Sequence, residues 1–263
     1  MVLEKLISLR TAVRNPVVMF IVGDIVALVC LVVAFLIFPE SVGIFTTLLI
    51  TMAMTPFMVD LMAYEEARAE EDLEKRRQQN LLLRHSNILN IFIAFFGGVI
   101  LALTVVFMML PENVTQLMFK DQITEIQVIR GNFAFADTFE RIVVNNISVL
   151  LLSFLLSFLF GAGSIFILSW NASILATAIG MAAKTLGGLT ALPIAVMVFF
   201  PHGSLEILAY FIGAVAGGII SAAVTRRQSR HFWFVIRDSM LLLGISVGVL
   251  VVAGLIETAA MSV

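Results

Sequence analysis

The sequence has 263 residues, of which 60% are hydrophobic and only 13% are charged. Its mean hydropathy is +1.07. A soluble domain cannot bury this much apolar surface in one core, whereas a bilayer accepts runs of about 20 apolar residues as spanning helices. The net charge of -2 gives no global attraction to nucleic acid, and the single cysteine, Cys30, excludes an internal disulfide. We therefore expect an integral protein of a lipid bilayer, without a nucleic-acid partner.

The apolar runs are long and continuous, which favours helices over the short alternating strands of a membrane β-barrel. The predicted fold is an all-α, polytopic integral membrane helical bundle with about seven transmembrane helices. The predicted spans are Val17–Phe38, Val42–Met62, Ile88–Leu110, Val143–Leu168, a segment within Ala172–Phe200, Leu205–Val224 and Met240–Ile256.

Lysine and arginine residues gather before the first predicted span, between the second and third spans, and before the last span. Seven crossings place all three groups on one side, which the positive-inside rule assigns to the cytoplasm of a cell (plasma) membrane. The amino terminus is then cytoplasmic and the carboxyl terminus external. The charged amino-terminal residues lead directly into a full-length span, so we expect no removable signal peptide. The three groups are Lys5, Arg10 and Arg14; Arg68, Lys75, Arg76, Arg77 and Arg84; and Arg226, Arg227, Arg230 and Arg237.

Two regions are predicted along the chain. Residues 1–86 form a two-helix membrane hairpin followed by a charged cytoplasmic helix from Glu65 to Ser86, and residues 87–263 form the membrane core. The charged helix is rich in helix formers, with Glu and Arg at neighbour spacing, and is predicted to be solvated; a partner-docking surface is the alternative. An external amphipathic region, residues 112–142, is predicted to contain two short surface helices. Their apolar stripes are Phe119, Ile123 and Ile126, and Phe135, Phe139 and Ile142, with Gly131 between them.

Polar and small residues form one face on each of three consecutive predicted helices. Their spacings of three, four and seven residues superimpose them at about 100° per residue. The economical arrangement packs these faces around a common axis. The faces are Asn146, Ser153, Ser157 and Ser164; Ser173, Thr177, Gly180, Lys184 and Gly187; and His202, Glu206, Gly213 and Gly217.

Close helix packing explains most of these residues. Gly213 with Gly217, and Gly244 with Gly248, have GxxxG spacing, which brings helices together within one chain or between two copies. We therefore predict a homodimer. Packing does not explain charged residues as readily, because a charge near mid-membrane costs about 2.5 to 3.5 kcal/mol. Lys184 and Glu206 are accordingly candidates for function.

The segment from Asn171 to Phe200 is too long for one straight crossing. Thirty helical residues would extend about 45 Å, against a hydrocarbon core of about 30 Å. Two glycines and a proline between Lys184 and Pro193 predict an interrupted or re-entrant element. Pro201 is then expected in the first turn of the sixth helix, where an acidic residue also complements the helix dipole.

His202 and Glu206 are the predicted functional centre, in an outer-facing pocket bordered by Asn146 and by the segment near Lys184. The alternative is that Glu206 only stabilises a helix end and His202 only bonds a carbonyl. We expect no metal, because His85 and His231 lie on the opposite side and no thiol is near. HExxH, GxSxG and Walker patterns are absent, so we predict neither an enzyme nor a cofactor.

The stretch "NNISVLLLSFLLSFLFGAGSIFILSWNAS", residues 145–173, followed by "PHGSLEILA", residues 201–209, resembles the stage II sporulation protein M family, especially its archaeal-type members. The likeness extends from Arg84 to the carboxyl terminus. One departure is Leu208, where many members have proline. The paired asparagines of the family correspond to Asn145 and Asn146, its loop asparagine to Asn171, and its His-Gly-x-x-Glu motif to His202, Gly203 and Glu206.

The resemblance implies a multi-pass membrane protein without established catalysis of its own. In spore formers, the relative assembles with two cell-wall-degrading partners during engulfment. We therefore predict a non-enzymatic membrane scaffold or assembly factor, a homodimer with membrane or cell-envelope protein partners. The alternative is a small transporter or channel that uses a polar seam within the membrane.

Overall fold

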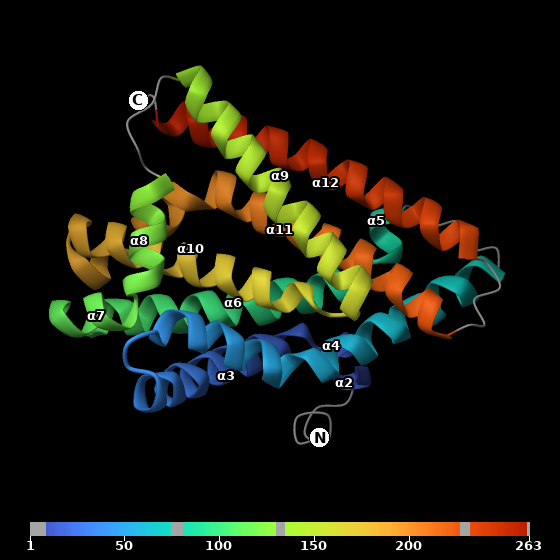
Figure 1. Ribbon diagram of the computed structural model, residues 1–263, viewed down its shortest axis with the longest axis horizontal. Helices are drawn as coiled ribbons and strands as arrows, with labels where there is room; N and C mark the ends of the chain where they lie inside the picture. The colour runs from blue at the N-terminus through green and yellow to red at the C-terminus, as the bar shows by residue number, and fades with distance from the viewer. Residues whose placement is uncertain (1–8, 75–80, 130–134, 227–231, 262–263) are drawn as a thin grey trace.

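A computed structural model describes residues 9–74, 81–129, 135–226 and 232–261. Within these ranges the regular structure is entirely helical, and seven of the helices are long and apolar enough to cross a membrane. The predicted all-α membrane bundle is therefore confirmed (Figure 1). The elements are α2 (Leu9–Arg14), α3 (Pro16–Ile37), α4 (Val42–Glu74), α5 (Leu81–Arg84), α6 (Ser86–Met109), α7 (Glu112–Met118), α8 (Lys120–Ile129), α9 (Phe135–Phe160), α10 (Ser164–Leu186), a 3-10 turn (Gly188–Ala191), α11 (Leu192–Arg226) and α12 (Phe232–Met261).

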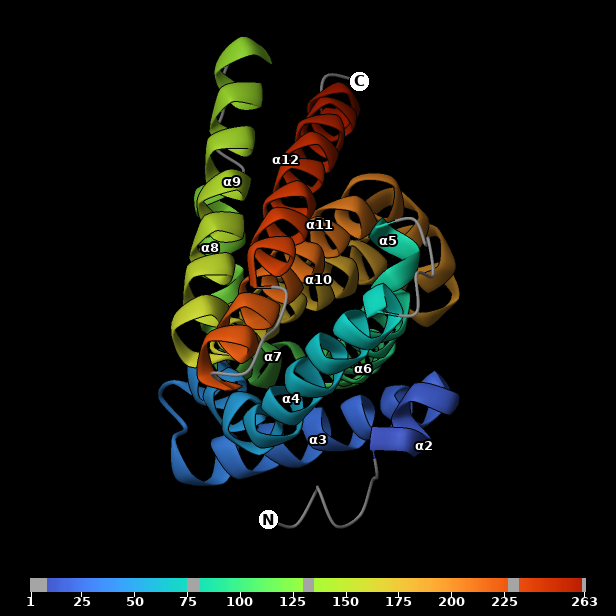
Figure 2. The ribbon, with the colours of Figure 1, turned by 90° about the vertical axis from the view of Figure 1, so that its right-hand side faces the viewer.

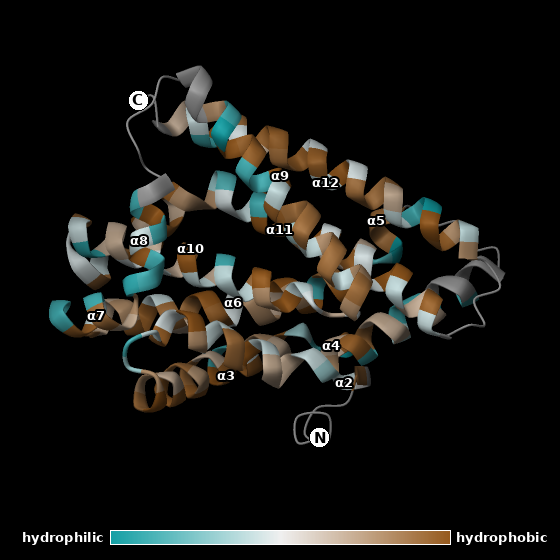
Figure 3. Ribbon diagram, in the orientation of Figure 1, coloured by the Kyte–Doolittle hydropathy of each residue, from teal (hydrophilic) through white to brown (hydrophobic). Residues whose placement is uncertain are grey.

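Helix α11 is the centre of the bundle. Helices α9 and α12 pack on one side of it, and α10, α4 and α6 pack on the other (Figures 1 and 2). Phenylalanine rings fill the crossing of α6 and α11: the Phe211 ring lies 5.2 Å from that of Phe96 and 5.6 Å from that of Phe92. The hydrophobic colouring of the outer helices continues to the surface (Figure 3). Val29, Leu155 and Val252 are about half exposed there, as expected of side chains that face lipid.

The first membrane helix packs directly on the core through two glycines. A Cβ atom on Gly23 would lie 2.0 Å from the carbonyl oxygen of Phe95, and one on Gly98 would lie 2.0 Å from that of Phe20. Any side chain at either position would therefore separate α3 from α6. Small residues allow this close approach of helix backbones, which is how membrane helices associate without a hydrophobic driving force between them.

Arginine residues gather at one end of the bundle, which we call the basic end. It contains the end of α2 with Arg14, the end of α5 with Arg84, the end of α11 with Arg226 and the start of α12 with Arg237 (Figure 1). The opposite end contains the α3–α4 turn, α7, the α10–α11 turn and the end of α12. Lys75, Arg76, Arg77, Arg227 and Arg230 of the predicted basic groups lie outside the described residues.

The fourth and fifth crossings differ from their predicted ranges. The fourth, α9, ends at Phe160 rather than at Leu168, because the chain reverses at Gly161, whose φ of 74° favours glycine. The fifth crossing is α10, Ser164–Leu186, which begins eight residues before Ala172. The apolar residues on both sides of this short turn concealed it in the hydropathy pattern.

The break predicted near Lys184–Pro193 is present, but it is a turn between two crossings. Gly187 and Gly188 have φ values of 126° and 81°, and the 3-10 turn that follows leads directly into α11. The sixth helix therefore begins at Leu192, and the prediction that Pro201 lies in its first turn is wrong. Membrane helices tolerate an internal proline, because neighbouring groups satisfy the freed backbone atoms.

The region of residues 112–142 contains one of the two predicted short surface elements. Phe119, Ile123 and Ile126 form a buried face where α7 and α8 meet the bundle, as predicted. The second predicted surface helix instead belongs to the first turns of α9, in which Phe139 and Ile142 pack toward Gly254 of α12. Gly131 lies outside the described residues.

Candidate functional site

A chain of side-chain hydrogen bonds joins α9 to α11 in the half of the bundle away from the basic end. The Asn145 Nδ2 atom donates to Asn146 Oδ1 at 3.2 Å, and Asn146 Nδ2 donates to Glu206 Oε1 at 2.9 Å. Asn146 is 6% exposed, whereas Asn145 lies on the outer surface of α9. The structure therefore brings together three residues of the predicted site.

Two residues that the sequence analysis did not identify complete this group. The side chain of Glu257, near the end of α12, lies beside that of Glu206. Tyr210, one turn after Glu206, is 3% exposed and interacts electrostatically with both carboxyls. The four-residue spacing of Glu206 and Tyr210 could have indicated that they share a helix face. No local sequence pattern indicates that Glu257 lies near either of them. We call Asn145, Asn146, Glu206, Tyr210 and Glu257 the carboxyl cluster.

Close packing of α9 on α11 fixes the position of this cluster. A Cβ atom on Gly213 would lie 2.2 Å from Leu150 Cδ1, and one on Gly217 would lie 2.2 Å from the carbonyl oxygen of Phe154. The two helices run in the same direction, and Asn146 lies one to two turns, and Glu206 two to three turns, before these contacts. Gly213 and Gly217 therefore serve packing within the chain, which is one of the two roles predicted for them.

On the other side of the cluster, Gly254 of α12 faces Val143 of α9, with 2.9 Å between a Cβ atom at Gly254 and Val143 Cγ2. Glu257 follows Gly254 by one turn, so this contact places the carboxyl of Glu257 beside α9 and α11. Glu206 itself is the fifteenth residue of α11. A dipole effect is confined to the first turn of a helix, so stabilisation of a helix end does not explain Glu206.

His202 and Gly203 lie one turn from Glu206 on α11. The ring of His202 lies 5.9 Å from the ring of Phe199, and its Nδ1 atom is buried without a hydrogen-bond partner among the described residues. Gly203 packs against Leu175 of α10, whose Cδ1 atom would be 3.4 Å from an added Cβ. The imidazole is therefore near the carboxyl cluster in sequence and on the same helix, but not bonded to it.

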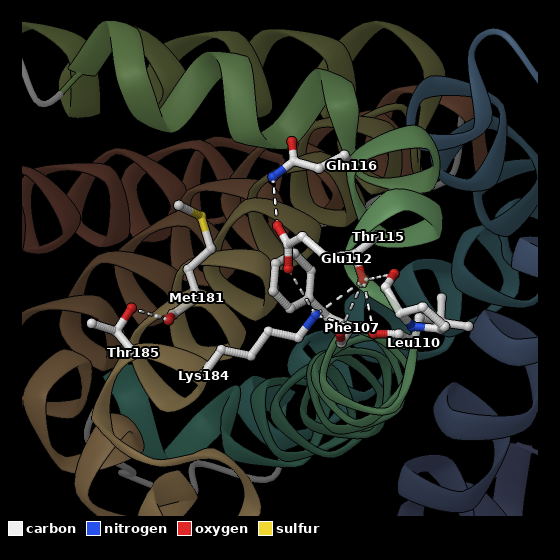
Figure 4. A network of polar contacts seen from close by, with 9 residues as sticks. Phe107, Leu110, Glu112, Thr115, Gln116, Met181, Lys184 and Thr185 are labelled. Atoms are coloured by element: carbon white, nitrogen blue, oxygen red, sulfur yellow. Dashed lines mark hydrogen bonds and ion pairs between the residues drawn. The ribbon is translucent and has the colours of Figure 1, made fainter.

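Lys184 binds a different part of the molecule (Figure 4). Its Nζ atom donates to the carbonyl of Leu110 at 3.2 Å and to Thr115 Oγ1 at 3.1 Å, and it lies 3.5 Å from Glu112 Oε2. The same Nζ atom lies 4.9 Å from the centre of the Phe107 ring. Lys184 thus connects the end of α10 to the end of α6 and to α7, rather than bordering the carboxyl cluster.

The Glu112 carboxyl beside Lys184 is stabilised in its ionised form. A hydrogen bond from Gln116 Nε2 to Glu112 Oε1, 2.8 Å long, is the main cause that lowers the pKa of Glu112, and the charge of Lys184 lowers this pKa further. The location of Lys184 near the end of α10, two residues before Leu186, explains how its charge is accommodated. The sequence analysis assumed that Lys184 lies near mid-membrane, and its position at the helix end makes that assumption unnecessary.

Asn171, the remaining predicted site residue, is inside α10 rather than in a loop. Its Nδ2 atom donates to the carbonyl of Ile167 at 2.8 Å, one turn earlier in the same helix. The fourth predicted span ended too late, at Leu168, and this error placed Asn171 in a connection. Within the described residues, the side chain of Asn171 hydrogen-bonds its own helix and not the carboxyl cluster.

The small and polar faces predicted on three helices are filled by neighbouring side chains. Ser157 and Ser164 are both fully buried, and their Oγ atoms are 2.7 Å apart. Ser173 accepts a hydrogen bond of 3.2 Å from Gln122 of α8. A Cβ atom on Gly180 would lie 2.6 Å from Phe107 Cδ1. The Ser157–Ser164 bond joins α9 to α10, but Ser173 and Gly180 of α10 face α8 and α6, so the predicted packing of all three faces around one axis is wrong for this part of α10.

A second polar group lies at the basic end, where the sequence predicted a solvated helix. That prediction is wrong for the start of the charged stretch, because Glu65 is 1% and Glu66 is 0% exposed. His85 Nδ1 lies 3.3 Å from Glu65 Oε1, and Arg84 forms a salt bridge with Asp238 of α12. Continuation of α4 to Glu74 packs this stretch against the neighbouring helices. We call Glu65, Arg68, Arg84, His85 and Asp238 the basic-end cluster.

Two glycines of α12 have no neighbour among the described residues. A Cβ atom at Gly244 or at Gly248 would meet nothing within 4 Å, and both residues are exposed. They differ in this respect from Gly213 and Gly217, which α9 covers. The second GxxxG pair therefore presents an open face on the surface of the bundle.

Comparison with known proteins identifies the family but no individual relative. No curated protein and no solved structure gives a significant match to the chain. The family model described as stage II sporulation protein M matches residues 91–260, which include the whole carboxyl cluster and α6 through almost all of α12. The chain therefore belongs to the stage II sporulation protein M family.

Proposed function

We propose that the chain is a non-enzymatic membrane scaffold or assembly factor that acts through contacts with other membrane or cell-envelope proteins. The observation that supports this role is the close packing of the faces that a transporter would need to open. Gly217 meets the backbone of α9, and the Ser157 and Ser164 hydroxyls bond each other in a fully buried position. These contacts occupy the polar seam with protein groups.

Cross-linking and pull-down from native membranes test the proposal most directly. A scaffold should co-purify with a membrane or envelope protein in a fixed ratio, and cysteines on the surface of α12 should cross-link to it. Cysteines on the surface of α3, such as Val29→Cys, serve as the control for random encounters in the bilayer. Recovery of the chain without any stoichiometric partner or second copy, under mild detergent and in nanodiscs, would contradict the scaffold role.

The open face of α12 is the proposed site of self-association. Gly244 and Gly248 are one turn apart and exposed, and GxxxG faces of this kind allow two membrane helices to approach closely. A second copy of α12 fits this face because each copy presents the same two glycines in the same membrane. The proposed homodimer therefore joins α12 to its counterpart in the second copy.

A pair of glycine substitutions separates dimerisation from folding. Gly244→Leu should shift the detergent-solubilised dimer to monomer at unchanged thermal stability, since nothing lies within 4 Å of the new Cβ. Gly213→Leu should instead lower stability, because the added side chain would collide with Leu150. Val29→Leu, on the exposed surface of α3, is the control for added bulk. A Gly244→Leu variant that remains dimeric would exclude this face.

The proposed location is the cell membrane, with the basic end in the cytoplasm. The support is the arrangement of Arg14, Arg84 and Arg237 at one end of the bundle, combined with the positive-inside rule. In a Cys30→Ser background, Glu112→Cys should react with an impermeant thiol reagent from outside, and Glu71→Cys should not. Reaction of Glu71→Cys alone would reverse the orientation.

His202 and Glu206 are proposed to be required for partner recruitment rather than for folding. The imidazole Nδ1 of His202 has no partner among the described residues, and the macrodipole does not explain Glu206. Glu206→Gln and His202→Ala should therefore express and dimerise normally but fail to complement a deletion strain. Full complementation by both variants at normal expression would remove this pair from the mechanism.

The alternative function, a small transporter or channel, has one observation in its favour. Glu206 and Glu257 place two carboxyls within membrane-spanning helices, and such residues often belong to ion or proton pathways. Purified protein in liposomes should show no proton or cation flux above that of empty liposomes if the scaffold role is correct. Flux that Glu206→Gln abolishes would favour the alternative.

A further inference from the structure

Arg237, in the second turn of α12, carries a charge that its neighbours do not balance. Arg84 forms a salt bridge with Asp238, and these two side chains are only 13% and 8% exposed. Arg237 Nη2 lies 3.8 Å from Asp238 Oδ1, but the side chain of Arg237 is 68% exposed. Among the residues that the structure describes, Asp238 is the one acid that Arg237 contacts. Two guanidinium groups thus share one carboxylate, which leaves a positive charge at the exposed Arg237.

The ring of Phe234 positions both guanidinium groups. The Arg84 Cζ atom lies 4.8 Å from the centre of this ring, and the Arg237 Cζ atom lies 5.2 Å from it. Cation–π attraction of this kind holds an arginine in place without neutralising its charge. The planar fork of N–H donors on a guanidinium matches two oxygens of a phosphate group. Arg237 is therefore an exposed, positioned donor for a phosphate.

The exposed face of α12 around Arg237 has the residue types of a membrane–water interface. Trp233, one turn before Arg237 on the same face, is 80% exposed. Met240 and Leu241, one turn after it, are about half exposed. Tryptophan gathers at the level of the lipid headgroups, and aliphatic side chains face the acyl chains. Arg237 lies between these two layers.

The length of α12 agrees with this depth. The candidate span Phe232–Ala260 has 29 residues, which extend about 44 Å as a helix, against a hydrocarbon core of about 30 Å. Charged side chains avoid the hydrocarbon, so the turn with Arg237 belongs in the headgroup region. Helix α5 packs against α12 and exposes Leu82 and Leu83, as expected of residues that contact lipid.

We propose that Arg237 and Trp233 form a binding site for the headgroup of an anionic phospholipid. Arg237 binds the phosphate, the Trp233 ring lies beside the headgroup, and an acyl chain lies along Met240 and Leu241. The positive charge favours a lipid with a net negative charge over a zwitterionic lipid. The site lies in the turns of α12 before Gly244, so it depends neither on the scaffold role nor on self-association.

Tryptophan fluorescence in liposomes tests the site, because Trp170 and Trp233 are the two tryptophans of the chain. In a Trp170→Phe background, Trp233 is the reporter. The liposomes contain equal amounts of phosphatidylcholine and phosphatidylglycerol, and one of the two lipids carries brominated chains that quench a nearby tryptophan. Quenching should show that phosphatidylglycerol binds about fivefold more tightly beside Trp233, the ratio expected of one basic residue near the membrane surface. Equal quenching by the two lipids would overturn the proposal.

Matched arginine variants assign this preference to Arg237. Arg237→Gln should remove it, whereas Arg237→Lys should retain it because the charge is kept. Arg14→Gln changes the net charge by the same amount at an exposed residue of the same end, and it should leave the preference intact. All three variants should unfold at the Tm of the parent protein, since both arginines are exposed. A preference that persists in Arg237→Gln, or that Arg14→Gln removes equally, would contradict the site.

Two further measurements distinguish the phospholipid from other occupants of this face. Inorganic phosphate should weaken the preference no more than sodium chloride does at the same ionic strength; a larger loss would mean that the site takes a soluble anion. The preference should also remain in Gly244→Leu, whether that variant is dimeric or monomeric. A preference lost together with the dimer would mean that two copies are needed for the site, and the site on a single chain would be excluded.

Discussion

The two polar clusters occupy opposite halves of the bundle and balance their charges differently. In the basic-end cluster, acids meet bases: Arg84 pairs with Asp238, and His85 lies 3.3 Å from Glu65. In the carboxyl cluster, Glu206 meets an amide and a second acid, Glu257. Both clusters join α12 to other helices, the first through α5 and the second through α9 and α11.

The difference indicates different roles for the two clusters. The Arg84 and Asp238 charges neutralise each other, which suits a permanent connection between α5 and α12. Two neighbouring acids repel each other when both are ionised, so Glu257 and Glu206 do not connect helices in this way. Helix α12, which carries the open Gly244 and Gly248 face, therefore has an ion pair to its neighbours at the basic end and an acid beside Glu206 at the other end.

The largest expected effect is at the basic end. Arg84→Ala leaves the carboxyl of Asp238, which is 8% exposed, without its main partner. Removal of one member of a buried ion pair costs about 3 to 5 kcal/mol, and Arg237 offsets part of this cost. Thermal unfolding in mild detergent should show a clear fall in Tm, whereas Arg14→Ala, an exposed arginine at the same end, should leave Tm unchanged. An equal effect from both would mean that the salt bridge has no structural role.

The two histidines give a matched comparison between the ends. His85→Ala empties a fully buried position beside Glu65, since His85 is 2% exposed and its Nδ1 atom lies 3.3 Å from Glu65 Oε1, and removal of a buried ring costs stability through the contacts that are lost. His202→Ala breaks no hydrogen bond of the described structure, because His202 Nδ1 has no partner there. The Tm of the His85 variant should therefore fall more than that of the His202 variant. The reverse order would show that His202 has a structural bond that depends on lipid or on a partner.

Within the carboxyl cluster, Asn146→Ala removes the hydrogen bond from α9 to Glu206. Hydrogen bonds between membrane helices average about 0.6 kcal/mol in double-mutant cycles, so the loss of stability should be small. Asn171→Ala is the matched control, because its amide bonds only a carbonyl of its own helix at 2.8 Å. Steric-trap or detergent unfolding should rank Asn146→Ala as the more destabilising of the two. Equal values would argue that the Asn146–Glu206 bond contributes nothing to the union of α9 and α11.

The smallest effect is expected at Glu112 of α7. Its pKa is lowered in the folded protein, first by Gln116 and then by Lys184, so its stabilising contribution is present above the unfolded pKa. That contribution should disappear as the pH falls from about 4.3, the ordinary value for glutamate, through the lowered folded pKa. Amide exchange in α7 should accelerate over this range in the wild type and less in Glu112→Gln. Identical profiles would show that Lys184 holds α7 without help from this charge.

Hydropathy and spacing predicted the helical architecture better than the residues at which the helices begin and end. The long apolar runs predicted an all-α bundle with about seven crossings, and the structure has this architecture. Hydropathy did not locate the reversal at Gly161, because apolar residues lie on both sides of it and only the backbone reveals the positive φ. The same limitation hid the start of α11 at Leu192, where the turn is short and the following residues are apolar.

For the candidate site, the sequence by itself determined that Asn146, His202 and Glu206 are polar groups on helix faces, because spacing along one helix fixes which residues share a face. Only the tertiary structure decided that Glu206 meets Glu257 and that Lys184 meets Leu110. Each of these contacts joins helices distant in sequence. The GxxxG spacing indicated close packing at Gly213 and Gly217 but not which helix covers them, and nothing local indicated that Gly254 faces Val143 of α9.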